Sequence, residues 1–308
     1  MLKTSEKNGA VLVSKMPTIE LLSTPHWKDY ELLDSGSSLK LERFGPYQFI
    51  RPEHQAVWKP ALSTKEWDKA DAVFQPTSDE SGGKWQFKRQ IEPQWEMHYK
   101  DLSFMARTSN SRHLGVFPEQ ATHWDWIREQ VSAHPKPVNV LSLFGYTGIA
   151  SLAADKAGAN VTHLDASKKI VLYAKENQLR SGLAEKPIRW IIDDAVKFVM
   201  RESRRGIHYD GIIMDPPKFG RGPKGEVWEF FKMLPYLLQE IRPVLASRPL
   251  FLVITAYAIR ASALSLHFSI QDMMSSYKGT LSSGELVIYE KSAGRILSMA
   301  ITTRWSSL

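Results

Sequence analysis

From residue 138 onward, apolar positions follow two spacings in turn, one typical of buried strands and one typical of helices. Residues 138–143 form a short apolar run, 149–157 carry alanine and leucine at helical spacing, and 160–164 form a second apolar run. Short apolar runs bounded by turn residues are typical of strands that are buried on both faces of a parallel sheet. The same alternation predicts helices over 168–179, 196–202, 226–245 and 261–277, and strands over 188–192, 209–214 and 250–255. The second half of the chain is therefore predicted to be an α/β fold.

The first third of the chain has a different pattern. Residues 1–35 are polar with scattered apolar positions and no sustained period, which predicts a loosely attached arm. Residues 36–112 alternate apolar and polar positions around turn sequences such as Gly45-Pro46, which predicts a small β-rich subdomain. Residues 113–308 would then form the third unit, the α/β domain.

Four tryptophans, Trp58, Trp67, Trp85 and Trp95, fall in the β-rich subdomain, close in sequence to arginines and lysines. Aromatic rings beside cations can stack nucleic-acid bases on a surface. Large side chains are also what a small β-rich unit needs to fill its core. Both interpretations stay open, and we favour the core.

The composition narrows the function classes. The chain of 308 residues has no cysteine, which excludes disulfides, zinc–thiolate sites and every mechanism with a cysteine nucleophile. No metal site is predicted. The net charge of +7 favours a polyanionic partner. No apolar run approaches the ~20 residues that cross a bilayer, and the first residues lack the pattern of a secretory signal, so we expect a cytoplasmic protein without a membrane partner.

The sequence between the first two predicted strands indicates a cofactor site. Gly145 and Gly148 make a loose glycine turn, and Asp165 follows the second strand, where a parallel strand ends at the ligand crevice. Nicotinamide and flavin enzymes carry a third glycine, which lets a pyrophosphate approach backbone N–H groups, whereas here Tyr146 and Thr147 crowd the loop. S-adenosylmethionine has no phosphate, and an acid in the position of Asp165 can hold both ribose hydroxyls. The turn alone leaves either cofactor open.

A second motif, Asp215-Pro-Pro-Lys-Phe219, falls at the end of the fourth predicted strand, beside the same crevice. Two prolines make a rigid bend and remove two backbone donors, so Asp215 and the free carbonyl groups are predicted to form a cluster of acceptors near the transferable methyl group. The ring of Phe219 is predicted to lie against a planar base. Methyl transfer needs mainly alignment, which such a bend can supply. In isolation, an Asp-Pro-Pro sequence is also a common turn.

The end of the chain predicts an antiparallel addition to the sheet. Two apolar runs in the last 25 residues are joined by the turn Lys291-Ser-Ala-Gly294, which predicts a β-hairpin. This ending is usual in class I methyltransferases and uncharacteristic of dinucleotide oxidoreductases. The fold class predicted is therefore a Rossmann-like, seven-stranded α/β sheet with an antiparallel C-terminal hairpin, preceded by the small β-rich subdomain.

The segments LSLFGYTGIASLAA, VTHLDASKK, YAKENQ, DDAVKFV and YDGIIMDPPKFG together resemble one family of class I S-adenosylmethionine-dependent methyltransferases. That family includes the bacterial large-subunit ribosomal RNA enzymes that make 5-methylcytosine and 7-methylguanine, and the resemblance spans nearly half of the chain. It implies S-adenosylmethionine as cofactor and ribosomal RNA as substrate. The cofactor residues that it implies are Phe117, Glu119, Gln120, Phe144, Gly145, Tyr146, Thr147, Gly148, Asp165, Ala166, Ser167, Asp193, Asp194, Ala195 and Asp215, and the substrate side is Asp215, Pro216, Pro217, Lys218 and Phe219.

Within that set the resemblance implies particular contacts. Asp165 would bind the ribose, Asp194 would accept from the adenine amino group, and Asp215 would lie near the sulfonium. Phe117, Glu119 and Gln120 belong to a segment that would fold over the cofactor from the N-terminal side.

One departure from the family decides the expected chemistry. The 5-methylcytosine members use a cysteine after the fifth strand to add covalently to the pyrimidine, and this chain reads ITAYAIR there. Carbon 5 of cytosine is not nucleophilic without that adduct, whereas a nitrogen attacks through its own lone pair. We therefore expect methylation of nitrogen or oxygen, with an RNA nitrogen first. A protein or small-molecule acceptor, and more remotely a nicotinamide-dependent oxidoreductase, are the alternatives.

Overall fold

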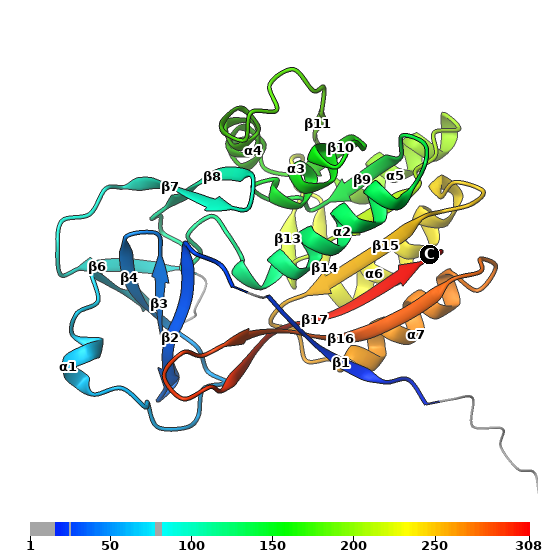
Figure 1. Ribbon diagram of the computed structural model, residues 1–308. Coiled ribbons are helices and arrows are strands. Elements are labelled where there is room, and N and C mark those ends of the chain that lie inside the picture. The colour runs from blue at the N-terminus through cyan, green and yellow to red at the C-terminus, as the bar shows by residue number, and fades with distance from the viewer. Residues whose placement is uncertain (1–15, 25, 78–81) are drawn as a thin grey trace, which may run out of the picture.

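The computed structural model describes residues 16–24, 26–77 and 82–308, and its centre is an eight-stranded sheet (Figure 1). The strands lie in the order β1 (Ile19–Ser23), β16 (Thr280–Tyr289), β17 (Ile296–Ser306), β15 (Phe251–Ala256), β12 (Gly211–Met214), β9 (Asn139–Leu143), β10 (Asn160–Asp165) and β11 (Arg189–Ile192). β17 is antiparallel to both of its neighbours, and the other pairs are parallel. The predicted α/β fold with an antiparallel C-terminal hairpin is confirmed.

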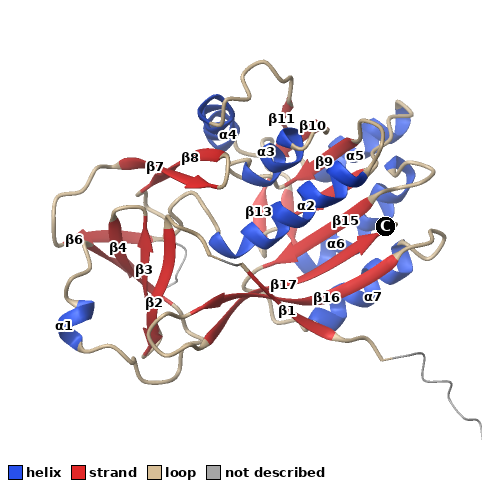
Figure 2. Ribbon diagram, viewed as in Figure 1, coloured by secondary structure: helices blue, strands red, loops and turns tan. Residues whose placement is uncertain are grey.

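Helices cover both faces of this sheet (Figure 2). They are α2 (Ala121–Ala133), α3 (Ile149–Lys156), α4 (Lys168–Arg180), α5 (Ala195–Arg204), α6 (Phe230–Ile241) and α7 (Ala263–Met273), with the 3-10 turns η1 (Pro118–Gln120) and η2 (Arg242–Val244). Successive strand residues point to opposite faces, and the core divides accordingly. Val140 packs in the cluster that holds α2 and α3, whereas its neighbour Leu141 packs in the cluster that holds α5, α6 and α7.

The predicted arm is the main correction, and it explains the eighth strand. Residues 1–15 lie outside the described residues. Residues 19–23, however, form β1, which adds to the edge of the sheet in register with β16. Ile19, Glu20 and Leu21 are all exposed, so this strand has no alternation of apolar and polar positions to reveal it. The backbone approaches so closely that a Cβ on Gly284 would lie 2.0 Å from the Glu20 carbonyl oxygen, so only glycine fits there.

A five-stranded sheet forms the β-rich subdomain. Its strands are β2 (Tyr30–Gly36), β3 (Leu39–Phe44), β4 (Tyr47–Pro52), β5 (Ala72–Pro76) and β6 (Gly83–Phe87), in that order. The hairpin around Gly45-Pro46 is confirmed. Residues 30–35 of the predicted arm belong to β2, and the short helix α1 (Thr64–Trp67) precedes β5. The boundaries of the three predicted units remain predictions.

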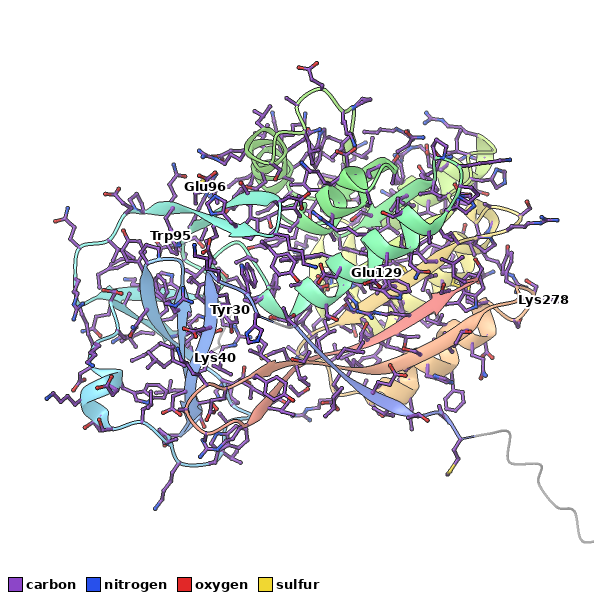
Figure 3. The ribbon with its side chains drawn as sticks, viewed as in Figure 1. Tyr30, Lys40, Trp95, Glu96, Glu129 and Lys278 are labelled. Carbon is purple, nitrogen blue, oxygen red and sulfur yellow. The ribbon has the colours of Figure 1, made fainter. Side chains whose placement is uncertain are left out.

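The tryptophans of this subdomain pack inward. Trp95, labelled in Figure 3, is 7% exposed and stacks on Phe49 with ring centroids 5.5 Å apart. Trp58 and Trp85 pack half-buried against the same core. Trp67 donates a hydrogen bond from its indole nitrogen to Asp34 at 2.8 Å. The core interpretation of the tryptophans is confirmed.

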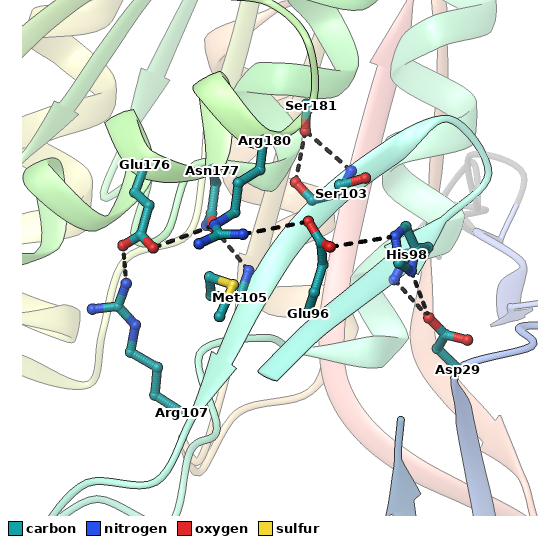
Figure 4. A network of polar contacts seen from close by, with 10 residues as sticks. All are labelled: Asp29, Glu96, His98, Ser103, Met105, Arg107, Glu176, Asn177, Arg180 and Ser181. Atoms are coloured by element: carbon teal, nitrogen blue, oxygen red, sulfur yellow. Dashed lines mark hydrogen bonds and ion pairs between the residues drawn. The ribbon is translucent and has the colours of Figure 1, made fainter. Parts of the chain in front are cut away.

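A two-stranded ribbon, β7 (Gln94–Tyr99) and β8 (Leu102–Arg107), connects the subdomain to helix α4 (Figure 4). The buried side chain of Asn177 accepts from the backbone N–H of Met105 at 3.0 Å, and Arg107 forms an ion pair with Glu176. Asn177 also donates to the carbonyl oxygen of Thr147 at 2.9 Å. One amide side chain therefore joins the ribbon to the glycine turn.

One helix prediction is confirmed and one needs correction. The helix predicted over 168–179 is α4, on which Leu172 is 54% exposed. The helix predicted over 226–245 begins only at Phe230, because residues 219–221 and 227–229 pair as a small hairpin, β13 (Phe219–Arg221) and β14 (Val227–Glu229). In the described part of the chain, no helix has the length and apolar character that crossing a membrane requires.

Candidate active site

A cleft of about 1310 Å³ lies at the carboxyl ends of the parallel strands, between the large sheet and the β-rich subdomain. Pockets for one small molecule usually measure about 300–1,000 Å³, so this cleft has room for a nucleoside cofactor and an acceptor together. The predicted residues that line it are Phe117, Glu119, Phe144, Tyr146, Asp165, Ala166, Ser167, Asp193, Asp194, Ala195, Asp215, Pro216, Pro217 and Lys218. The structure thus brings the glycine turn and the Asp-Pro-Pro corner to one site.

The glycine turn packs closely against β10 and α4. Phe144 and Tyr146 adopt left-handed φ angles of 57° and 48°, which are energetically unfavourable for residues other than glycine. A Cβ on Gly145 would lie 2.4 Å from His163 Cε1, and one on Gly148, at φ 85°, would lie 2.8 Å from the Ala174 Cβ. Both glycines are therefore needed where the turn packs on β10 and α4.

Four of the predicted cofactor residues do not line the cleft: Gln120, Gly145, Thr147 and Gly148. The buried hydroxyl of Thr147 donates to the carbonyl oxygen of Gly115 at 2.7 Å, so this side chain fastens the turn from below. All four instead line a smaller cavity of about 50 Å³, which shares Phe144, Tyr146 and Asp215 with the cleft.

Asp165 ends β10 with its carboxylate already oriented. One carboxylate oxygen accepts from the backbone N–H of Ser167 at 2.8 Å and the other from that of Tyr146 at 3.1 Å. Burial raises the pKa of Asp165, while these two hydrogen bonds oppose the rise. The turn and the carboxylate are therefore a single preformed unit.

The acids after β11 have separate tasks. Asp193 forms an ion pair with Arg201, and its other oxygen accepts from the Asp194 N–H at 2.8 Å. Asp194 caps helix α5 by accepting from the Lys197 N–H at 3.0 Å. Only one oxygen of Asp194 is used in the cap, so the other is available to the cleft.

The corner at 215–219 differs from its prediction in two respects. The carbonyl oxygen of Pro217 is not a free acceptor, because the indole nitrogen of Trp228 donates to it at 2.6 Å. Phe219 does not line the cleft and is 57% exposed on the small hairpin. In β14, Trp228 takes the inward position, 4.8 Å from the Phe144 ring between centroids. The hairpin pairing decides which aromatic ring faces the cleft.

Three buried polar atoms meet at the other side of the corner. Glu119 Oε1, Asp215 Oδ1 and the Tyr257 hydroxyl have no hydrogen-bond partner among the described residues, and all three residues line the cleft. The second oxygen of Asp215 accepts from the Gln120 amide at 3.2 Å. Burial, followed by the nearby Glu119 carboxyl, raises the pKa of Asp215 to about 8. Burial likewise raises the pKa of Glu119 and of Tyr257.

A buried ion pair of the β-rich subdomain stands behind Glu119. Arg51 donates twice to Glu42, at 2.7 Å each, and Lys40 lies 3.8 Å from the same carboxylate. The positive charges of Lys40 and Arg51 oppose the rise of the Glu119 pKa, but burial dominates. Lys40, labelled in Figure 3, lies on β3 opposite Ser35 of β2. The subdomain therefore forms one wall of the cleft.

Sequence reasoning missed three residues of this site. Tyr257 lies in the segment ITAYAIR, which drew notice only for lacking a cysteine, and Trp228 lay inside a predicted helix. Asn177 lies in YAKENQ, one of the segments that resemble the family, and that resemblance was the available signal. Neither Tyr257 nor Asn177 follows a glycine or proline turn that would mark it, whereas Trp228 follows the loop 220–225.

Comparison with known proteins places this site in a family. A scan of protein-family models found none that matches. The crystal structure of the S-adenosylmethionine-dependent methyltransferase from Agrobacterium tumefaciens matches with a TM-score of 0.90 and 46% identity, over 95% of this chain and 96% of that one. The methyltransferase SMU.776, complexed with S-adenosylhomocysteine, matches with a TM-score of 0.68 over 90% of this chain and 75% of that one, but at 16% identity this likeness shows the fold alone.

Two curated relatives match over shorter stretches. Ribosomal RNA large subunit methyltransferase K/L of Shewanella frigidimarina is 36% identical over 100 residues, which are 32% of this chain and 14% of that protein. Ribosomal RNA large subunit methyltransferase I of Aeromonas salmonicida is 33% identical over 119 residues, 38% of this chain and 29% of that protein. The chain therefore spans less than a third of the length of these relatives.

The fold and the cleft define a class I methyltransferase. The chain belongs to the family of S-adenosylmethionine-dependent methyltransferases, and S-adenosylmethionine is its cofactor. The described residues fit this molecule, because a preoriented carboxylate at Asp165 suits a ribose diol and the small side chains of Ala166 and Ala195 leave space for a flat base. The family excludes the nicotinamide oxidoreductase that the glycine turn alone left open.

Proposed function

We propose that the protein methylates a nitrogen atom of an RNA base, with ribosomal RNA as the source, and that no covalent enzyme–base adduct forms. The observation that carries this proposal is the absence of cysteine from the full sequence, beside a corner that presents a carboxyl group to the cleft. Carbon 5 of a pyrimidine needs a nucleophilic adduct before it can attack a methyl group, whereas a nitrogen does not. The chemistry therefore reduces to alignment of the two reactants.

Asp165 is the proposed anchor of the cofactor. Its carboxylate is held by two backbone N–H groups and lies at the end of β10, where both oxygens retain lone pairs for the ribose hydroxyls. Asp194 keeps one oxygen for the adenine amino group, and Phe144 and Tyr146 lie toward the methionine end. Bound S-adenosylmethionine supplies an electrophilic methyl group on a sulfonium, and these residues orient it.

Charge at the cleft supports RNA as the substrate. The rim, which we define as Lys218, Arg221 and Arg260, consists of exposed cations that make no ion pair with any described residue. The interior instead carries the carboxyl groups of Asp165 and Asp215. Rim cations suit phosphate groups that pass outside while a base enters the cleft. The net charge of +7 and the names of the two ribosomal RNA relatives point the same way.

The deciding experiment follows a labelled methyl group. The protein is incubated with methyl-tritiated S-adenosylmethionine and either deproteinised cellular RNA or the matching RNA-free protein and small-molecule fractions. We expect label in the RNA, and nuclease digestion followed by mass spectrometry then identifies the nucleoside. Label confined to protein or to small molecules would overturn the RNA assignment, and a carbon-methylated base would overturn the nitrogen assignment.

The cofactor anchor is tested separately. Asp165→Ala removes two charge-assisted hydrogen bonds to the ribose, worth about 2–3 kcal/mol together, so calorimetric affinity for S-adenosylhomocysteine should fall about 30- to 150-fold. Asp272→Ala, an exposed acid on α7, is the matched control and should bind normally. Unchanged binding by a folded Asp165→Ala protein would remove Asp165 from the site.

A further inference from the structure

The three unpartnered polar atoms of Glu119, Asp215 and Tyr257 lie together, and we call them the acceptor pocket. Glu119 is 1% exposed, yet its Oε1 receives no hydrogen bond from any described residue, and the same holds for Asp215 Oδ1 and the Tyr257 hydroxyl. Each therefore leaves a buried polar atom unsatisfied, which destabilises the free protein. Because all three residues line the cleft, a bound molecule is what can satisfy them.

Strand order places this pocket beyond the cofactor. The ends of β11, β10 and β9 follow one another across the sheet and carry Asp194, Asp165 and Phe144. β12 and β15 come next in the same row and are followed by Asp215 and Tyr257. An adenosine that starts at Asp194 therefore points its methionine end toward β12. This inference rests on the proposed function, because the acceptor must then lie at the ends of β12 and β15.

The chemistry of the pocket selects between two kinds of nitrogen. A ring nitrogen such as N7 of guanine presents a lone pair beside the acceptor O6, and the carboxyl group of the pair that stays ionised repels both. An exocyclic amino group presents two N–H donors, which carboxylate oxygens and a tyrosine hydroxyl accept. We propose that the acceptor pocket receives an exocyclic amino group of the base, with Glu119 and Tyr257 as binding residues beside Asp215, so that the enzyme makes an N-methylated amino group.

The transfer step balances within this pocket. The lone pair of the amino nitrogen forms the new C–N bond while the C–S bond breaks and leaves its electron pair on sulfur, which yields S-adenosylhomocysteine. The nitrogen is then positively charged and releases a proton to whichever carboxyl group of Glu119 and Asp215 is ionised. No metal, oxidant or further reactant is needed.

The surroundings allow the pocket to hold that proton. Burial raises the pKa of both Glu119 and Asp215, and the Glu119 carboxyl raises that of Asp215 further. On the other elements packed against them, Lys40, Arg51 and Glu42 face Glu119, while Gln120 donates to Asp215. Two adjacent buried carboxyls with a net deficit of donors hold one proton between them readily.

Two ligands that differ at one position test the binding residues. Sinefungin carries an amine-bearing carbon in place of the methyl-bearing sulfur of S-adenosylmethionine, whereas S-adenosylhomocysteine keeps the sulfur and lacks the methyl group. We expect the unaltered protein to bind sinefungin at least 10-fold more tightly than S-adenosylhomocysteine. Glu119→Gln and Tyr257→Phe should each shrink that ratio to about 3-fold or less while binding S-adenosylhomocysteine normally, which also shows that they are folded.

The product identifies the acceptor group directly. Mass spectrometry of labelled RNA nucleosides should find the methyl group on an exocyclic amino nitrogen. A 7-methylguanosine product, or a sinefungin preference that survives in both variants, would overturn the acceptor pocket. Neither result affects the proposed cofactor anchor, which would fail only if Asp165→Ala bound S-adenosylhomocysteine normally.

Discussion

The two ends of the cleft are built on opposite principles. At the cofactor end, both oxygens of Asp165 accept backbone hydrogen bonds, and the hydroxyl and carbonyl of Thr147 are paired with Gly115 and Asn177. At the acceptor end, Glu119, Asp215 and Tyr257 each leave a buried polar atom without a described partner. The first end is complete before a ligand binds, and the second end is not.

This difference indicates which end of the cleft holds the cofactor and which end selects the acceptor. A preformed end holds its ligand by shape and loses little entropy on binding, which suits a cofactor that every catalytic cycle uses. An unsatisfied end costs stability in the free protein and gains it back only with a ligand that supplies the missing donors. Discrimination among acceptors is therefore expected at Glu119, Asp215 and Tyr257, and not at the glycine turn.

The largest effect on stability is expected from adding a methyl group where the glycine turn packs against α4. Gly148→Ala forces a left-handed alanine whose Cβ lies 2.8 Å from the Ala174 Cβ, so the free energy of unfolding should fall by about 2–4 kcal/mol. Gly182→Ala is the matched control, because Gly182 has φ 67° with open space around it, and it should lose only about 1 kcal/mol. Urea denaturation of both variants measures the difference. Equal losses would show that packing on α4 does not hold the turn.

The next effect concerns the stability of the acceptor end. Asp215 has a folded pKa of about 8, well above the ~3.9 of an unfolded aspartate, so the folded protein holds a proton there between those values. The free energy of unfolding should therefore fall as pH rises from about 4 through 8. Asp215→Asn removes this loss and should be about 1–3 kcal/mol more stable than the unaltered protein at pH 9, with no advantage at pH 4. Thermal unfolding of both proteins at pH 4 and pH 9 measures this difference. A variant less stable than the unaltered protein at pH 9 would contradict the buried, unpaired state of Asp215.

A third prediction concerns binding across the same pH range. As Asp215 ionises, its charge favours a sulfonium over a neutral thioether. The ratio of the affinity for S-adenosylmethionine to that for S-adenosylhomocysteine should therefore rise about 10-fold from pH 6.5 to 9. In Asp215→Asn this ratio should not change with pH. Both ligands share every other titrating group, so their ratio in calorimetry isolates the pocket. A flat ratio in the unaltered protein would place the sulfonium away from Asp215.

The smallest effect is expected at the rim. Arg221→Ala removes one exposed cation beside the cleft, so RNA affinity should fall about 2- to 5-fold at physiological salt, with the slope of log affinity against log salt reduced by about 1. Lys278→Ala, on a loop far from the β-rich subdomain in Figure 3, should change neither quantity. Equal effects of the two variants would mean that the attraction for RNA is spread over the whole surface.

Much of the fold of this protein was predictable from the sequence alone. Short apolar runs alternating with helical spacing are a local property of the chain, and so the α/β domain, its hairpin and the positions of Asp165 and Asp215 were predictable. Tertiary structure decided what local pattern does not encode. β1 has an exposed surface and is a strand only because the edge of β16 lies beside it, and Phe219 faces outward because β13 pairs with β14. The meeting of Glu119, Asp215 and Tyr257 from three distant segments was likewise beyond the sequence, because burial without a partner is a property of packing in three dimensions.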